Sequence, residues 1–154
     1  RVARQALDVL AALSPAREMQ WATALVALGD EAPALESAPA QGRLPAMLEG
    51  VRAAEQVWAL HARPEGRANA EGLRRLLLAI VRDLRVVPVL LALQLARLRR
   101  AAALPEDQRR ELATLAADIH APLANRLGIW QLKWEIEDLA FRFQQPETYQ
   151  RIAK

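Results

Sequence analysis

The sequence contains no cysteine, few aromatic residues and no long uncharged run. Without cysteine the chain can form neither disulfides nor thiolate metal sites, a composition typical of cytoplasmic proteins. The uncharged run from Val86 to Ala96 is far shorter than the roughly 18 apolar residues that a membrane-spanning helix requires. No signal-peptide pattern is present at the start. We therefore predict a cytoplasmic protein without a membrane partner, whose uncharged run belongs either to a basic binding helix or to a buried core helix.

Neither positive nor negative charge is in large excess in this chain. The 21 lysines and arginines stand against 18 aspartates and glutamates, which leaves a net charge of +3. This excess is too small to indicate a nucleic-acid partner, so we expect no direct nucleic-acid binding. Glycine-rich phosphate loops and nucleophile elbows are missing as well. No catalytic motif can be identified from local sequence patterns alone.

The apolar residues that make up 53% of the chain recur at helical spacing. No segment alternates with a period of two, so strands are not predicted. We predict one all-α domain over residues 1–154, with seven to nine helices. The first residues already follow a helical pattern, so we expect further sequence upstream. The longest pattern, 73–100, predicts one helix kinked at Pro88, and residues 61–72 are predicted to form a polar loop.

Few side chains offer metal or acid–base chemistry. Neither His61 nor His120 has a second histidine three or four positions further on, so both are interpreted as surface or capping residues. The acidic pair Asp30 and Glu31 follows a predicted helix and could bind a metal or act as a base. A capping role is the more usual one for such a pair.

Several longer stretches carry a family resemblance. The segment IHAPLANRLGIWQLKWEIEDLAFRFQQPETYQRIAK, at Ile119–Lys154, closely resembles YAPLANRLGIxQLKWELEDxxFRYxxPxxYxxIAK of the RelA/SpoT family, whose long enzymes make and degrade ppGpp and pppGpp. The stretches at Leu73–Arg100 and Met47–Leu60 are similar to further segments of that family. The resemblance implies an all-α HD domain.

The resemblance also implies where a metal site would be. In bifunctional members the HD domain hydrolyses the 3′-pyrophosphate with a manganese ion. Its ligands are an upstream histidine, the His-Asp of HDxxED and the aspartate of LADRLHN. These ligand positions fall on Val2, Val26, Ala27 and Leu93, none of which can coordinate a cation. We therefore expect no manganese, no other cofactor and no alarmone hydrolysis. The resemblance also implies that the uncharged run Val86 to Ala96 is a former active-site helix that now lies in the core.

Loss of this ligand set beside an intact C-terminal motif resembles the RelA branch. Its long enzymes place an inactive hydrolase-like domain before a synthetase domain, which acts with the ribosome and uncharged tRNA. We expect this chain to end before that synthetase domain and to have a structural or regulatory role toward it. Three aromatic residues on the last long helix are the predicted contact with that domain: Trp130, Trp134 and Phe141. In the alternative interpretation they are ordinary core residues of a folded spacer.

Two other functions are compatible with the sequence. One is a hydrolase with a rebuilt metal site, which would use Asp30, Glu31, Asp83 and His120. The other is a guanine-nucleotide-binding module without a metal, whose residual pocket would use Asp30, Glu31, Arg97, Asn125 and Arg126. The acidic pair in both corresponds to the acidic pair of HDxxED.

Overall fold

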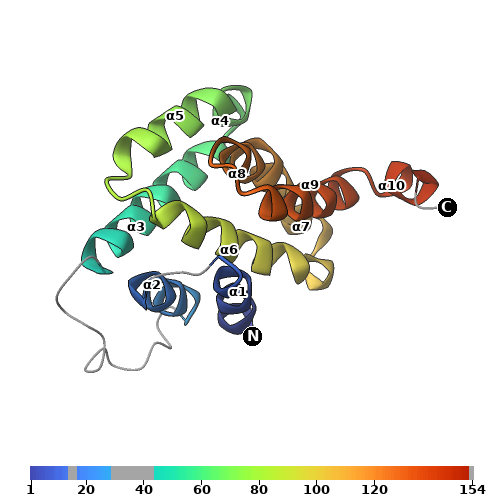
Figure 1. Ribbon diagram of the computed structural model, residues 1–154. Helices are drawn as coiled ribbons and strands as arrows, with labels where there is room; N and C mark the ends of the chain where they lie inside the picture. Colours follow the sequence, from blue (N-terminus) through green and yellow to red (C-terminus); the bar gives the residue numbers. More distant parts are fainter. Residues whose placement is uncertain (14–16, 29–43, 153–154) are drawn as a thin grey trace.

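Helices joined by short turns make up the part of the chain that the computed structural model describes, residues 1–13, 17–28 and 44–152 (Figure 1). No strand occurs in these ranges, so the all-α prediction is confirmed. The α-helices are α1 (Val2–Ala11), α2 (Arg17–Leu28), α3 (Leu44–His61), α4 (Pro64–Ala68), α5 (Ala70–Ile80), α6 (Val86–Arg99), α7 (Glu106–Leu115), α8 (Ala121–Arg126), α9 (Trp130–Gln144) and α10 (Pro146–Ile152). A short 3₁₀ turn, η3 (Ala101–Ala103), precedes α7, and a π-helical turn, η4 (Ala116–His120), joins α7 to α8.

Helix α6 is the centre of the fold. It packs against α1, α2, α3, α7, α8 and α9, and Figure 1 shows it between the α3–α5 helices and the α7–α9 helices. Eleven of its 14 residues are buried. A helix that is apolar around its whole circumference must be covered on all sides. The predicted core location of the uncharged run Val86 to Ala96 is thus confirmed.

The segment between Leu73 and Arg100 forms two helices, so the predicted single kinked helix is wrong. Helix α5 ends at Ile80, and Val81 is extended, with φ −76° and ψ 109°. The Asp83 carboxylate stabilises the turn that follows, because it accepts hydrogen bonds from the Arg85 backbone N–H (3.1 Å) and guanidinium (2.7 Å). Pro88 lies in the first turn of α6, where a missing N–H costs no helical hydrogen bond.

Residues 61–72 are mostly helical, and the predicted polar loop is wrong. Helix α4 begins with Pro64, whose fixed φ suits a first helical position. Only Asn69 separates α4 from α5. The Asn69 side chain caps α5 by accepting a hydrogen bond from the Gly72 N–H at 3.2 Å. Proline and asparagine here begin helices rather than interrupt them.

The π-helical turn η4 has a local cause in Pro122. A proline has no N–H, so the Asp118 carbonyl cannot receive the usual helical bond from four residues further on. The Arg74 guanidinium on α5 donates to this carbonyl instead. The N–H of Ala121 bonds to Ala116, five residues back. His120, the last residue of this turn, is buried.

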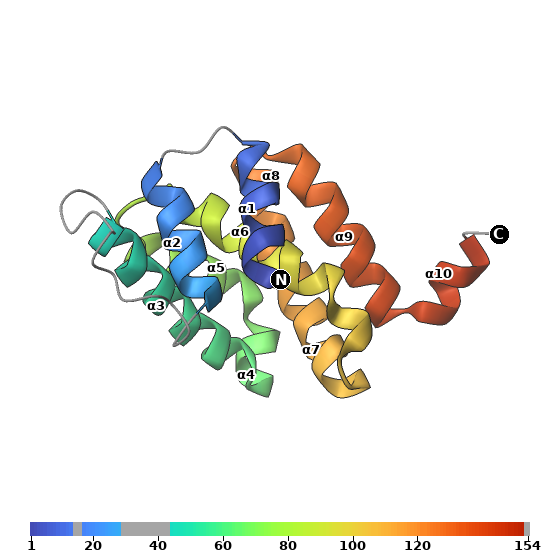
Figure 2. The ribbon, with the colours of Figure 1, turned by 90° about the horizontal axis from the view of Figure 1, so that it is seen from below.

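The C-terminal helix α10 projects away from the rest of the helices, as Figures 1 and 2 both show. Its contacts are with α9, from which only Gln145 separates it. None of the described helices is both long enough and apolar enough to cross a bilayer.

Candidate functional site

Two of the positions predicted to correspond to metal ligands of the family line one small cavity. Val26 on α2 and Leu93 on α6 both line a space of about 10 Å³. The other lining residues come from α3, α6 and η4: Val51, Glu55, Trp58, Leu90, Gln94, Arg97 and His120. A cavity of this size holds about one water molecule. A metal ion with a phosphate ester does not fit into it.

The chemistry of these positions is equally unsuited to manganese. Leu93 is only 3% exposed and, like Val26, packs in the hydrophobic core. Val2 and Ala27 also pack against the core, but neither lines this cavity. Aliphatic side chains cannot replace the water shell of a divalent cation. Within the described ranges, no three histidine or carboxylate side chains gather into a group that could hold a metal.

His120 contributes the most perturbed ionisable group of this cavity. Its ring lies 4.7 Å from the Trp58 ring, centroid to centroid, and its Nδ1 is 3.4 Å from the Leu115 carbonyl oxygen. The pKa of His120 is lowered to about 3, mainly by burial; the nearby charge of Arg97 acts in the same direction, and the hydrogen bond with the Leu115 carbonyl opposes it. The imidazole is therefore neutral at physiological pH.

Arg97 and Glu55 form the polar edge of the cavity. Burial lowers the pKa of the Arg97 guanidinium, and the negative charge of Glu55 acts in the opposite direction. Gln94, at 1% exposure, donates a hydrogen bond to the Leu112 carbonyl at 3.1 Å and so fixes α6 to α7. Glu55, Trp58 and Gln94 were not identified from the sequence, because nothing in their local pattern indicates that they face Leu93.

Both histidines are buried, each with 1% of its surface exposed, so their predicted surface or capping role is wrong. The Nε2 of His61 lies 2.8 Å from the Asp118 carboxylate. This pair links the end of α3 to η4, 57 residues further along the chain. Local sequence could not indicate the partner, since the pair depends on tertiary packing.

Of the three carboxylates predicted for a rebuilt metal site, the structure describes only Asp83. Asp30 and Glu31 lie outside the described residues. Asp83 lies in the turn before α6, where Arg85 neutralises it at 2.7 Å. It does not line the cavity that contains His120.

The residues of the predicted nucleotide pocket do not share one cavity. Arg97 lines the 10 Å³ space, whereas Arg126 lines another cavity of about 150 Å³. Arg74 and Glu71 of α5 line that second cavity as well, and the two are ion-paired. Asn125 is exposed and lines neither of the two.

The aromatic residues of α9 divide into exposed and partly covered ones. Trp130 and Trp134, one helical turn apart, are 54% and 63% exposed, and Leu127 beside them is 38% exposed. We call these three residues the tryptophan face. The Lys133 ammonium lies 3.9 Å from the centre of the Trp134 ring. Phe141 is half-buried, with its ring centroid 6.1 Å from that of Tyr149 in α10.

Comparison with known proteins identifies one protein family and several similar proteins. The family model of the HD domain matches residues 2–130. A GTP pyrophosphokinase of Photobacterium angustum is 53% identical over 87 residues, which are 56% of this chain and 12% of that protein. The GTP pyrophosphokinase of Escherichia coli is 46% identical over 111 residues, 70% of this chain and 15% of the relative. A probable guanosine-3′,5′-bis(diphosphate) 3′-pyrophosphohydrolase of Synechocystis is 48% identical over 84 residues, 54% and 11% respectively. The chain thus spans between 11% and 15% of the length of these relatives.

Proposed function

Since the chain belongs to the HD domain family, in the form that RelA/SpoT-type proteins carry, we propose that it is a member without hydrolase activity. The observation that carries this proposal is the small cavity, about 10 Å³, that Val26 and Leu93 line together. A divalent cation requires oxygen or nitrogen ligands, which these two aliphatic side chains do not offer. The small volume supports the same conclusion, because it accommodates about one water molecule.

We further propose that the domain acts by contact within a longer protein that makes ppGpp. The relatives named GTP pyrophosphokinase are several times longer than this chain, which leaves ample sequence in them for a synthetase domain. The tryptophan face supports such a contact, because an exposed pair of indoles is unusual on a free surface. Burial of about 100 Å² on each indole would contribute roughly 2.5 kcal/mol per residue.

The loss of hydrolase activity can be tested with the chain itself. We expect the thermal unfolding midpoint to stay unchanged with excess Mn²⁺, because an ion that binds only the folded state must raise it. Incubation with ppGpp and Mn²⁺ should release no pyrophosphate. A RelA/SpoT-type HD domain that keeps its His-Asp ligands is the positive control for both measurements. A midpoint raised by Mn²⁺ together with pyrophosphate release would contradict the proposal.

The regulatory contact needs the longer protein. We expect the double substitution W130A/W134A to change its rate of ppGpp synthesis severalfold, because the equilibrium between docked and undocked domains would shift. The matched control is Leu76→Ala, which removes an equally apolar side chain, 40% exposed, from α5. Equal synthesis rates in the double variant and the control would indicate a folded spacer. Action with the ribosome and uncharged tRNA, and a cytoplasmic location, stay predictions of the family resemblance.

A further inference from the structure

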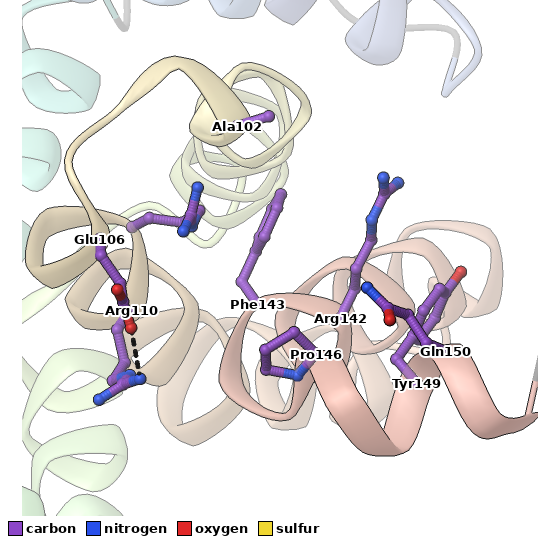
Figure 3. A pocket seen from close by; sticks show the side chains of 9 residues that line it. Ala102, Glu106, Arg110, Arg142, Phe143, Pro146, Tyr149 and Gln150 are labelled. Atoms are coloured by element: carbon purple, nitrogen blue, oxygen red, sulfur yellow. Dashed lines mark hydrogen bonds and ion pairs between the residues drawn. The ribbon is translucent and has the colours of Figure 1, made fainter.

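A larger cleft lies at the C-terminal end of the fold, away from the residues considered so far. Its volume is about 510 Å³, within the range of about 300–1,000 Å³ that is usual for small-molecule sites. Helix α7 forms one wall, and the end of α9 with α10 forms the other (Figure 3). We call it the arginine–aromatic cleft, after its main lining residues: Arg109, Arg110, Arg142, Phe143, Tyr149 and Gln150.

The charge of this cleft is not balanced by the protein. Arg110 is paired with Glu106 at 2.8 Å, the contact that Figure 3 marks. Arg109 and Arg142 have no carboxylate within ion-pair distance in the described part of the chain. Two cationic side chains without an ion-pair partner in the described part of the chain line the same cleft, so an anion bound there would be attracted to both. Guanidinium groups bind phosphate through two parallel hydrogen bonds, so a phosphorylated ligand suits this pair.

The Phe143 ring lies near both of these charges. The guanidinium carbons of Arg109 and Arg142 are 5.9 and 6.0 Å from the centroid of the Phe143 ring. Arg142 is also 5.9 Å from the Tyr149 ring centroid. Figure 3 shows Arg142 and Phe143 extending in the same direction from α9, with Tyr149 beside them. Rings and guanidinium planes are the surfaces on which nucleobases stack.

We propose that the arginine–aromatic cleft binds a nucleoside diphosphate or triphosphate. Its phosphates would bind Arg109 and Arg142, and its base would stack on Phe143 or Tyr149. The exposed amide of Gln150 offers both a donor and an acceptor to the edge of the base. An acidic peptide would use the arginines but leave the rings uncovered, so the rings favour a nucleotide. This inference does not depend on the proposed loss of hydrolase activity, because the two sites share no residue.

Calorimetric titration of the chain with ADP and GDP tests this proposal, with inorganic pyrophosphate as the anion alone. We expect at least one nucleotide to bind and pyrophosphate to bind more weakly, because it cannot stack. Arg142→Gln should weaken nucleotide binding roughly tenfold or more, the usual effect of losing a charge-assisted hydrogen bond. Phe143→Leu should weaken it about fivefold or more and leave pyrophosphate binding unchanged.

The matched control is Arg75→Gln, which removes an exposed arginine of α5 that is paired with Glu71 and lies outside the cleft. It should bind nucleotide as the unchanged chain does. Unfolding midpoints of all variants establish that each one is folded. Absence of nucleotide binding at millimolar concentration would overturn the proposal. Equal binding by the Arg142→Gln variant would overturn it too, as would pyrophosphate binding as tightly as nucleotide.

Nucleotide binding in the cleft and hydrolysis at the former metal site are distinguishable. Binding of ppGpp that Phe143→Leu weakens, without release of pyrophosphate, would support the cleft and leave the loss of hydrolase activity intact. Pyrophosphate release that Phe143→Leu leaves unchanged would contradict the proposed function alone.

Discussion

Acidification of the solvent should destabilise this domain through one buried side chain, His120. The ring is 1% exposed, and burial lowers its pKa from 6.5 to about 3. Charges on Arg97 and His61 lower the pKa as well, while the hydrogen bond to the Leu115 carbonyl opposes them. Below pH 6.5 the unfolded chain therefore binds a proton at this position that the folded chain does not bind.

This difference in proton binding makes the free energy of unfolding depend on pH. The free energy of unfolding falls as the pH decreases from about 6.5 toward 3, at up to about 1.4 kcal/mol per pH unit. Between pH 7.0 and pH 5.5 the loss amounts to about 1.3 kcal/mol. In a domain of this length, that corresponds to a decrease of about 3–5 °C in the unfolding midpoint. Ordinary carboxylates titrate mostly below this pH range, so they contribute little to it.

Urea unfolding at pH 7.0 and pH 5.5 measures this loss directly. His120→Gln should remove most of it, whereas His61→Gln, which leaves His120 in place, should retain it. Each variant is compared with itself at the two pH values, so a change in its overall stability does not affect the test. If His120→Gln lost as much stability between the two pH values as the unchanged chain, His120 would not be the group responsible. An NMR titration of the His120 ring with a midpoint near 6.5 would refute the reasoning independently.

Three further substitutions test the packing, each by chemical denaturation at pH 7. Leu93→Ala should lower the free energy of unfolding by about 2–5 kcal/mol, because the side chain is buried in a helix that packs against several others. A loss below about 1 kcal/mol would contradict the close packing. Asp118→Ala should cost about 1–3 kcal/mol, since it leaves the buried Nε2 of His61 without its partner; an unchanged midpoint would show that this pair contributes nothing. Gly128→Ala should cost about 1 kcal/mol through its φ of +70° alone, because no atom lies within 4 Å of the added Cβ; a larger cost would point to a clash instead.

Much of the fold could be predicted from sequence, because residues close together in the chain are enough to indicate a helix and its apolar face. The helical spacing of apolar residues predicts an all-α domain, and the uncharged run of α6 predicts its central position. The boundaries of α5 and α6 were harder, because Asp83 stabilises the intervening turn through contacts with Arg85 that the apolar pattern does not contain. Asn69 similarly caps a helix within what resembled a loop.

Comparison with the family motifs was enough to predict that Val26 and Leu93 stand at metal-ligand positions, and their aliphatic nature can be read directly from the sequence. Their meeting at one small cavity, with His120 buried beside them, depends on the packing of α2, α6 and η4. The same holds for the arginine–aromatic cleft, whose walls come from α7, α9 and α10. Helical periodicity gives the face of each helix, but contacts between distant helices depend on how those faces pack together.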